Sequence, residues 1–206
     1  MKPLGILFAI AISQAAAAAV ITNGTITITG TAPTGAFNFG GPGFAASGAF
    51  SDGVWGPTFC VACAPGSVLS VNGTEVGNDF SSGSATVGAS SFANVQWGDL
   101  NASGISIFTV SGPGIVLNAG AGIYHGTFSL TGSLCGTQGN AIPNPCVVNL
   151  PSLTGVGTVA VTVASVSGGL AYQSATYMFT PEPGTWVLVL IGGAAMLGLR
   201  FRKSSS

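Results

Sequence analysis

The side chains with which this chain could carry out acid–base or nucleophilic catalysis are few. His125 is the single histidine of the 206 residues, so any Ser-His-Asp arrangement would need it as the base. It lies in a segment that reads as a strand, and no Gly-x-Ser-x-Gly elbow follows a strand and opens a helix. Glycosidase chemistry needs two carboxylates about 5–10 Å apart. The carboxylates of the chain's central part all lie at or beside expected turns: Asp52, Glu75, Asp79 and Asp99. The sequence therefore predicts no catalytic residue, no cofactor and a non-enzymatic protein.

One short segment has the residue types of a calcium loop. In Asp99–Gly104, oxygen-bearing side chains alternate and a glycine follows for the sharp turn, as in the first half of an EF-hand loop. The twelfth position is Val110 rather than a bidentate glutamate, and a strand is expected from Ile105. A turn between two strands explains these residues better, so no metal site is predicted.

The four cysteines predict two disulfides, because an even number of cysteines in an exported chain favours pairing. Cys135 and Cys146 flank a loop with glycine and two prolines, which a bridge could close, and Cys60 and Cys63 could then pair with each other. Crossed pairings are the alternatives, and the sequence does not choose among the three connectivities. A redox pair would need a helix N-terminus that lowers a thiol pKa, and a zinc site suits the ten-residue gap between Cys135 and Cys146 poorly.

The central part of the chain, residues 20–180, is predicted to be one all-β domain. Val, Ile, Thr and Phe alternate with small or polar residues in short runs bounded by turn residues, which is typical of strands. The clearest runs are Thr25–Thr29 and Thr158–Val163, and Asn23-Gly24 and Asn72-Gly73 are strong turn signals. Further strands are expected at Phe44–Phe50, Ser67–Val71, Ala85–Gly88, Phe92–Gln96, Ile105–Val110, Ile115–Leu117, Ile123–Leu130 and Tyr172–Phe179. About ten such strands predict an antiparallel β-sandwich or jelly roll.

Charge narrows the possible partners of this domain. The four basic residues all lie at the two ends of the chain: Lys2, Arg200, Arg202 and Lys203. Residues 20–180 therefore cannot neutralise phosphates, and nucleic-acid binding is excluded from the functions that we expect. The same lack of lysine and arginine argues against electrostatic docking on anionic lipid.

The C-terminal residues 181–206 have the composition of a membrane segment with a basic stop. Pro181, Glu182 and Pro183 precede an apolar run, and about residues 184–201 could form one transmembrane helix, near the shorter end of the usual 17–25 residues. Its basic tail, residues 200–206, predicts a cytoplasmic C-terminus by the positive-inside rule. The three basic residues of this membrane stop are Arg200, Arg202 and Lys203.

This order of Pro181-Glu182-Pro183, apolar helix and basic cluster resembles the PEP-CTERM sorting signal of Gram-negative bacteria. The resemblance implies recognition by an exosortase, a membrane-embedded cysteine protease that acts at or near the Pro-Glu-Pro motif. It further implies transient anchoring in the inner membrane, followed by release or transfer at the cell surface. Such a tail is shared by proteins of many activities, so it does not indicate the molecular activity of this protein.

The N-terminal residues 1–19 read as a secretory signal peptide. Lys2 supplies a minimal basic region and an apolar core follows, before small residues that offer cleavage after Ala19 or, as second choice, after Ala17. The secretion translocon and signal peptidase are therefore expected partners.

Two classes of function follow for the exported domain. The first is a non-enzymatic structural protein of the cell surface or extracellular matrix, for which exopolysaccharide is an expected partner. The alternative is a carbohydrate- or ligand-binding β-sandwich module, in which Trp55, Trp97 and Tyr124 would stack on sugar faces if they were exposed on one face, although core packing is the commoner role of such rings.

Overall fold

The computed structural model describes residues 18–51, 53–76, 81–98, 106–138 and 146–181, and its described elements are strands and one short 3-10 helix. The elements up to the middle of the chain are β1 (Ala19–Ile21), β2 (Asn23–Thr29), β3 (Thr34–Gly41), β4 (Phe44–Phe50), β5 (Val54–Trp55), the 3-10 helix η1 (Gly56–Phe59), β6 (Val68–Leu69) and β7 (Gly73–Val76). They are followed by β8 (Ser81–Val87), β9 (Ser90–Trp97), β10 (Ser106–Ser111), β11 (Ile115–Val116), β12 (Gly122–Thr137), β13 (Val148–Val166) and β14 (Gly169–Thr180).

Twelve of these strands form one large sheet in the order β1-β13-β14-β2-β3-β4-β8-β9-β12-β10-β7-β5. All neighbours in it are antiparallel except β1 and β13, which are parallel. The remaining described strands, β6 and β11, pair with each other. The prediction of an all-β, mainly antiparallel fold is therefore confirmed.

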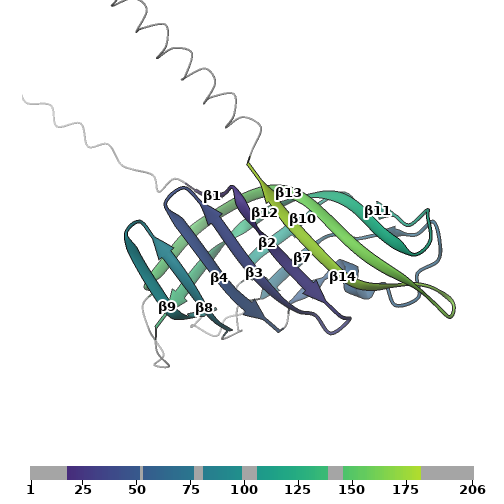
Figure 1. The fold of residues 1–206 in the computed structure, drawn as a ribbon, viewed down its shortest axis with the longest axis horizontal. Coiled ribbons are helices and arrows are strands. Elements are labelled where there is room, and N and C mark those ends of the chain that lie inside the picture. Colours follow the sequence, from purple (N-terminus) through teal and green to yellow (C-terminus); the bar gives the residue numbers. More distant parts are fainter. Residues whose placement is uncertain (1–17, 52, 77–80, 99–105, 139–145, 182–206) are drawn as a thin grey trace, which may run out of the picture.

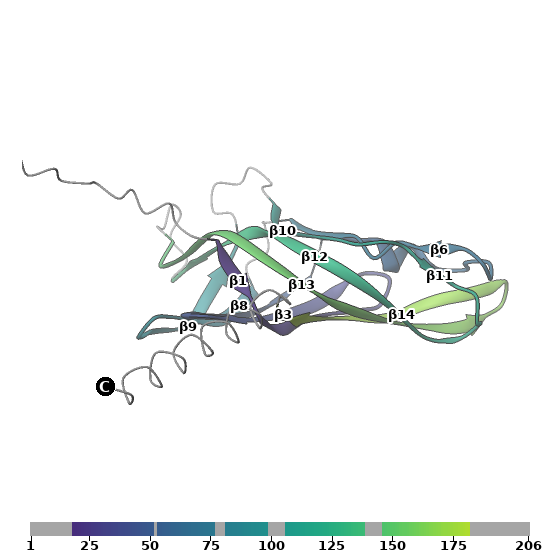
Figure 2. The ribbon, with the colours of Figure 1, turned by 90° about the horizontal axis from the view of Figure 1, so that it is seen from above.

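The sheet returns on itself, because β12 pairs with β13 along most of its length and with β9 near its end. Figure 1 looks onto β14, β2, β3, β4, β8 and β9, which lie side by side. Figure 2, turned by 90°, shows a second layer with β10, β12, β6 and β11 facing them, and β13 runs between the two. The apolar side of each layer is thus turned toward the other.

Alternation of side chains explains why these segments form strands. In β13, Val159, Val161 and Val163 are buried while the residues between them are less so, and in β2 the same holds for Ile26 and Ile28. A period of two places these residues on one side of the sheet. Both were predicted from the sequence.

Two strands are longer than the alternating runs suggested. β12 has 16 residues and β13 has 19, and β13 continues through Pro151, which cannot donate a ladder hydrogen bond. The pairing shifts there: Leu150 pairs with Leu134 and Leu153 with Gly132, so two residues of β13 face one of β12. A bulge of this kind is one of the few places where a sheet accepts proline.

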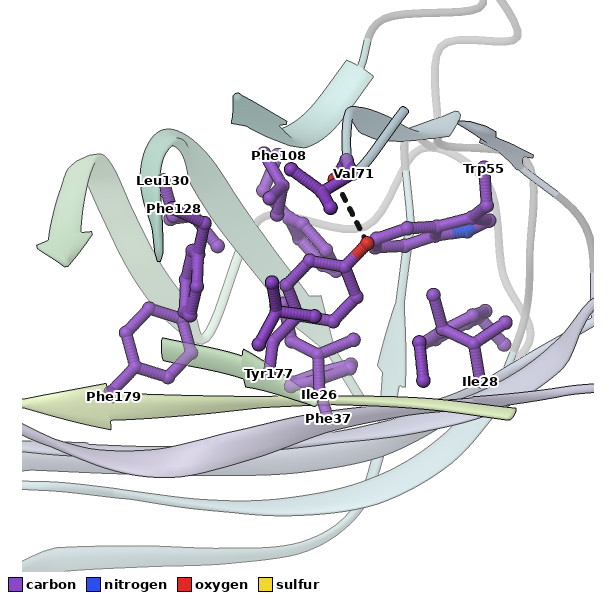
Figure 3. Close-up of a cluster of buried hydrophobic side chains, with 14 of the residues drawn as sticks. Ile26, Ile28, Phe37, Trp55, Val71, Phe108, Phe128, Leu130, Tyr177 and Phe179 are labelled. Carbon is purple, nitrogen blue, oxygen red and sulfur yellow. Dashed lines mark hydrogen bonds between the residues drawn. The ribbon is translucent and has the colours of Figure 1, made fainter. Parts of the chain in front are cut away.

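Aromatic side chains from both layers fill the space between them (Figure 3). Tyr177 of β14 lies 5.2 Å from Phe128 of β12 and 5.7 Å from Trp55 of β5, measured between ring centroids. Phe39 of β3 lies 5.4 Å from Phe179. Such edge-on and tilted pairs stabilise a core beyond the area that they bury.

None of the helical structure among the described residues is long and apolar enough to cross a membrane. The predicted membrane segment, about residues 184–201, and the basic tail lie outside the described part of the chain, as do Ala17 and most of the predicted signal peptide.

Candidate functional site: an uncharged polar row on the outer face

The outer side of the first layer carries a row of short polar side chains that crosses four neighbouring strands. Thr25 of β2 pairs with Asn38 of β3, Asn38 with Ser47 of β4, and Ser47 with Ser84 of β8. Alternation turns all four away from the core, since their neighbours Ile26, Phe37, Phe39, Ala46 and Ala85 are buried. We call Thr25, Asn38, Ser47 and Ser84 the polar row.

One adjacent pair of the row shares a hydrogen bond, and the Asn38 amide is left open. The Ser47 and Ser84 hydroxyls lie 2.9 Å apart. The Asn38 amide makes no hydrogen bond within the described part of the chain, so its donor and acceptor face solvent. The row therefore offers hydroxyl and amide groups that a ligand can reach.

A shallow hollow of about 270 Å³ lies on this row, lined by Asn38, Ala45, Ala46, Ser47, Ser84, Ala85 and Thr86. Of its three alanines only Ala45 is exposed, and this short side chain leaves space above the strands unfilled, whereas Ala46 and Ala85 are turned toward the core. At the rim, the Thr86 hydroxyl lies 3.4 Å from that of Ser91 on β9. The lining thus combines hydroxyl and amide groups with methyl groups and carries no charge.

Trp97 of β9 lies on the core side of the sheet and supports the backbone of the polar row. Its indole Nε1 donates a 2.8 Å hydrogen bond to the Ser47 carbonyl, and the ring is buried. Gly48 and Gly83 make room for it: a Cβ on Gly48 would lie 2.6 Å from Trp97 Cδ1, and one on Gly83 would meet both the Ser47 carbonyl and Nε1. Trp97 thereby fixes the backbone at the centre of the row.

The far end of the row is shaped by a bulge between β8 and β9. The register shifts between Gly83 and Ser84, so that Ser84 faces Ala93 and Gly83 faces Val95. Asn94, the extra residue, has φ 55° and is the one non-glycine residue with positive φ in the described chain. Asparagine tolerates this conformation better than most residues, and bulges commonly lie beside functional sites.

The electrostatics of the described surface are unusual. Glu75 is the single charged side chain among the described residues, and it is buried at 2% exposure within β7. It was expected at or beside a turn, and this was wrong: the segment after Asn72-Gly73 is a strand paired with both β5 and β10. Asp52, Asp79 and Asp99 lie outside the described residues.

The three aromatic rings considered as sugar platforms are all in the interior. Trp55 is 0%, Trp97 1% and Tyr124 8% exposed. The Tyr124 hydroxyl is also occupied, since it accepts from the Ala119 amide at 3.1 Å and donates to the Gly120 carbonyl at 2.5 Å. Stacking on these rings is therefore ruled out as a binding mode. Trp97 instead positions the polar row from the core side, through its hydrogen bond to the Ser47 carbonyl.

His125 lies in β12, as predicted, with an exposed side chain. Its strand neighbour on β13 is Ala160. Within the described ranges, no three His, Cys, Asp or Glu side chains gather in a way that could hold a metal ion; Asp99–Gly104 is not part of those ranges.

The predicted disulfides are confirmed, and of the three connectivities the structure has the local one. Cys60 pairs with Cys63 and Cys135 with Cys146, with Cα–Cα distances of 5.4 and 5.2 Å, both within the usual range. The Cys60–Cys63 turn is joined to β14 by backbone hydrogen bonds in both directions between Cys63 and Leu170. Two disulfides indicate an oxidising compartment.

The predicted sorting and cleavage residues are mostly beyond what the structure describes. Pro181 is exposed and follows β14, while Glu182, Pro183, Arg200, Arg202 and Lys203 are not described. Ala19 opens β1 and packs partly against the core.

Comparisons with protein-family models, with curated proteins and with solved structures find no match for this chain.

Proposed function

We propose that this chain is an exported, non-enzymatic structural protein of the cell surface or extracellular matrix. The observation that carries the proposal is the combination of two disulfides with a described surface that lacks charged side chains. Such a surface has little electrostatic resistance to close association with other neutral material. That property suits a matrix component better than a freely diffusing protein.

The route to the surface is proposed from the two ends of the chain. A signal peptide directs the chain to the translocon and is removed by signal peptidase. The segment from about 184 to 201 then holds the protein in the inner membrane, and an exosortase processes it at Pro181-Glu182-Pro183. The mature domain, residues 20–180, is proposed to be a β-sandwich of jelly-roll type, a class that the two facing layers support.

Cell fractionation of the producing bacterium tests this route. The wild-type protein is expected at the cell surface or in the medium, and the variant Glu182→Ala is expected to stay with the inner membrane. Ser167→Ala, an exposed substitution in the turn between β13 and β14, is the matched control and should behave as wild type. Equal surface amounts of all three proteins would contradict exosortase processing at this motif.

A second candidate function, a carbohydrate- or ligand-binding module, is favoured by the hollow on the polar row. That hollow is lined by amide, hydroxyl and methyl groups rather than by rings. Binding there would use hydrogen bonds and small apolar contacts.

A further inference from the structure

We infer that the polar row is a contact surface for an extended, uncharged polysaccharide chain that lies across strands β2, β3, β4 and β8. The inference deepens the second candidate function by naming the ligand class and the residues that meet it. It rests on the proposed export to the cell surface only because the protein and the polysaccharide would meet there.

The chemistry of the row matches a neutral sugar. Thr25, Ser47 and Ser84 each offer a hydroxyl that both donates and accepts, and Asn38 adds an amide with two donors and an acceptor. An acidic polysaccharide would call for lysine or arginine, and residues 20–180 contain neither. Sugar hydroxyls need the kind of paired donor and acceptor that this row provides.

The geometry of the row matches an extended chain. Neighbouring strands lie about 4.8 Å apart, close to the length of one pyranose residue in an extended polysaccharide. A chain laid across the strands would therefore place about one sugar over each strand, and each sugar would meet one member of the row. The four positions together span roughly 14 Å, which is three strand spacings.

The centre of the row, Ser47 and Ser84, is ordered before any ligand arrives. Its side chains are short, and Ser47 is fixed both by the hydrogen bond from Trp97 to its carbonyl and by the 2.9 Å contact with Ser84. Groups that are already ordered lose little conformational entropy on binding. The bulge at Asn94 adds an exposed amide beside the end of the row.

The hollow favours a polysaccharide over a second copy of this face. Two copies packed face to face would leave their hollows of about 270 Å³ opposite each other, and unfilled space costs packing energy. A sugar chain can fill the hollow and satisfy the amide together.

Affinity electrophoresis of the exported protein with its C-terminal segment retained, purified in mild detergent with its disulfides formed, tests the inference. The gels contain a neutral β-glucan such as hydroxyethyl cellulose, or alginate as the acidic counterpart, or no polysaccharide. The wild type is expected to be retarded by the neutral glucan and not by alginate. The triple variant N38A/S47A/S84A is expected to bind at least about tenfold more weakly, since three hydrogen-bonding groups are lost.

A triple variant of the opposite layer, S111A/S129A/T131A, is the matched control, because these residues are also exposed hydroxyls, on β10 and β12. It should bind as wild type. The single variant Asn38→Leu replaces the exposed amide by an apolar side chain of similar size. It should weaken binding severalfold, and it tests the inference even if the triple variant folds poorly. Three results would each overturn the inference. The first is unchanged retardation of both Asn38→Leu and the row variant, N38A/S47A/S84A. The others are equal retardation of the wild type by alginate and no retardation in any gel.

Self-association would overturn it too. If light scattering shows that the wild type is a dimer that the row variant cannot form, the occupant of the face is a second copy. Surface location with no glucan binding would overturn this inference alone and leave the proposed export route intact.

Discussion

The hydroxyl of Tyr177 donates a 2.9 Å hydrogen bond to the carbonyl of Val71, across 106 residues of sequence (Figure 3). Tyr177 belongs to β14 in one layer, and Val71 precedes β7 in the other. The bond is buried and lies within the aromatic cluster, so it fixes the two layers in one relative position. Tyr172 makes a comparable bond, at 2.8 Å, to the carbonyl of Ile28 on the neighbouring β2.

Replacement of Tyr177 by Phe is expected to lower the free energy of unfolding by about 1–3 kcal/mol. The ring packing with Phe128 and Trp55 would remain, but the buried Val71 carbonyl would lose its partner, and an unsatisfied buried group carries this cost. Urea unfolding followed by tryptophan fluorescence measures it. Ser174→Ala, a partly exposed site on the same strand, should change stability by less than about 0.5 kcal/mol; a similar loss in both variants would contradict the role given to the bond.

Stability is expected to fall at alkaline pH. Burial raises the pKa of both Tyr172 and Tyr177 well above the usual value for tyrosine. Below about pH 10, the unfolded-state pKa, both rings are protonated in either state and their contribution is complete. Above it the unfolded chain loses protons that the folded chain keeps, so the free energy of unfolding should drop by up to about 1.4 kcal/mol per pH unit for each tyrosine.

Urea unfolding between pH 8 and pH 11 checks this expectation. The double variant Y172F/Y177F, although less stable throughout, should show a shallower fall above pH 10. The same slope in wild type and double variant would mean that other groups cause the alkaline loss.

The two disulfides should contribute unequally. Cys135 and Cys146 are 11 residues apart in sequence, and Cys60 and Cys63 only 3. In the chain-entropy model, loss of the longer bridge costs about 3 kcal/mol and loss of the shorter about 2 kcal/mol. Thermal unfolding of C135A/C146A and C60A/C63A, each with the other bridge intact, measures the difference. A larger loss for C60A/C63A would show that the contacts of that turn with β14 outweigh chain entropy.

Gly83→Ala is expected to damage the polar row from within. The added methyl group would meet the Ser47 carbonyl and the Trp97 indole nitrogen, so the backbone of β8 would have to move away from β4. Overpacking of this kind typically costs about 1–3 kcal/mol. Differential scanning calorimetry should show a lower Tm, whereas Gly126→Ala, whose new Cβ would lie 3.1 Å from the flexible end of Ile115, should lose less. An unchanged Tm for Gly83→Ala would contradict the close contact between Gly83 and Trp97.

The strands with clear alternation could be predicted from the sequence, and others could not. Phe44–Phe50 forms β4 with the expected bounds. β3, Thr34–Gly41, was missed because three of its eight residues are glycine, which weakens the strand signal. Its place between β2 and β4 comes from packing of Phe37 and Phe39 against the opposite layer, which involves residues far away in sequence.

The polar row could not be predicted from the sequence either. Asn38, Ser47 and Ser84 are residue types that commonly occupy turns, and nothing in their sequence spacing indicates that they are neighbours. Only the register of four strands brings them together. Trp97 was considered as an exposed platform because sequence alone does not reveal which side of β9 faces the core.

The intact mass of the protein recovered from the cell surface tests export with processing at both ends more directly than any other measurement. We expect a chain that begins after Ala17 or Ala19, ends at or near Pro181-Glu182-Pro183, and is about 4 Da lighter than its fully reduced form because it holds two disulfides. A surface-located chain that still extends through Ser206 would contradict it.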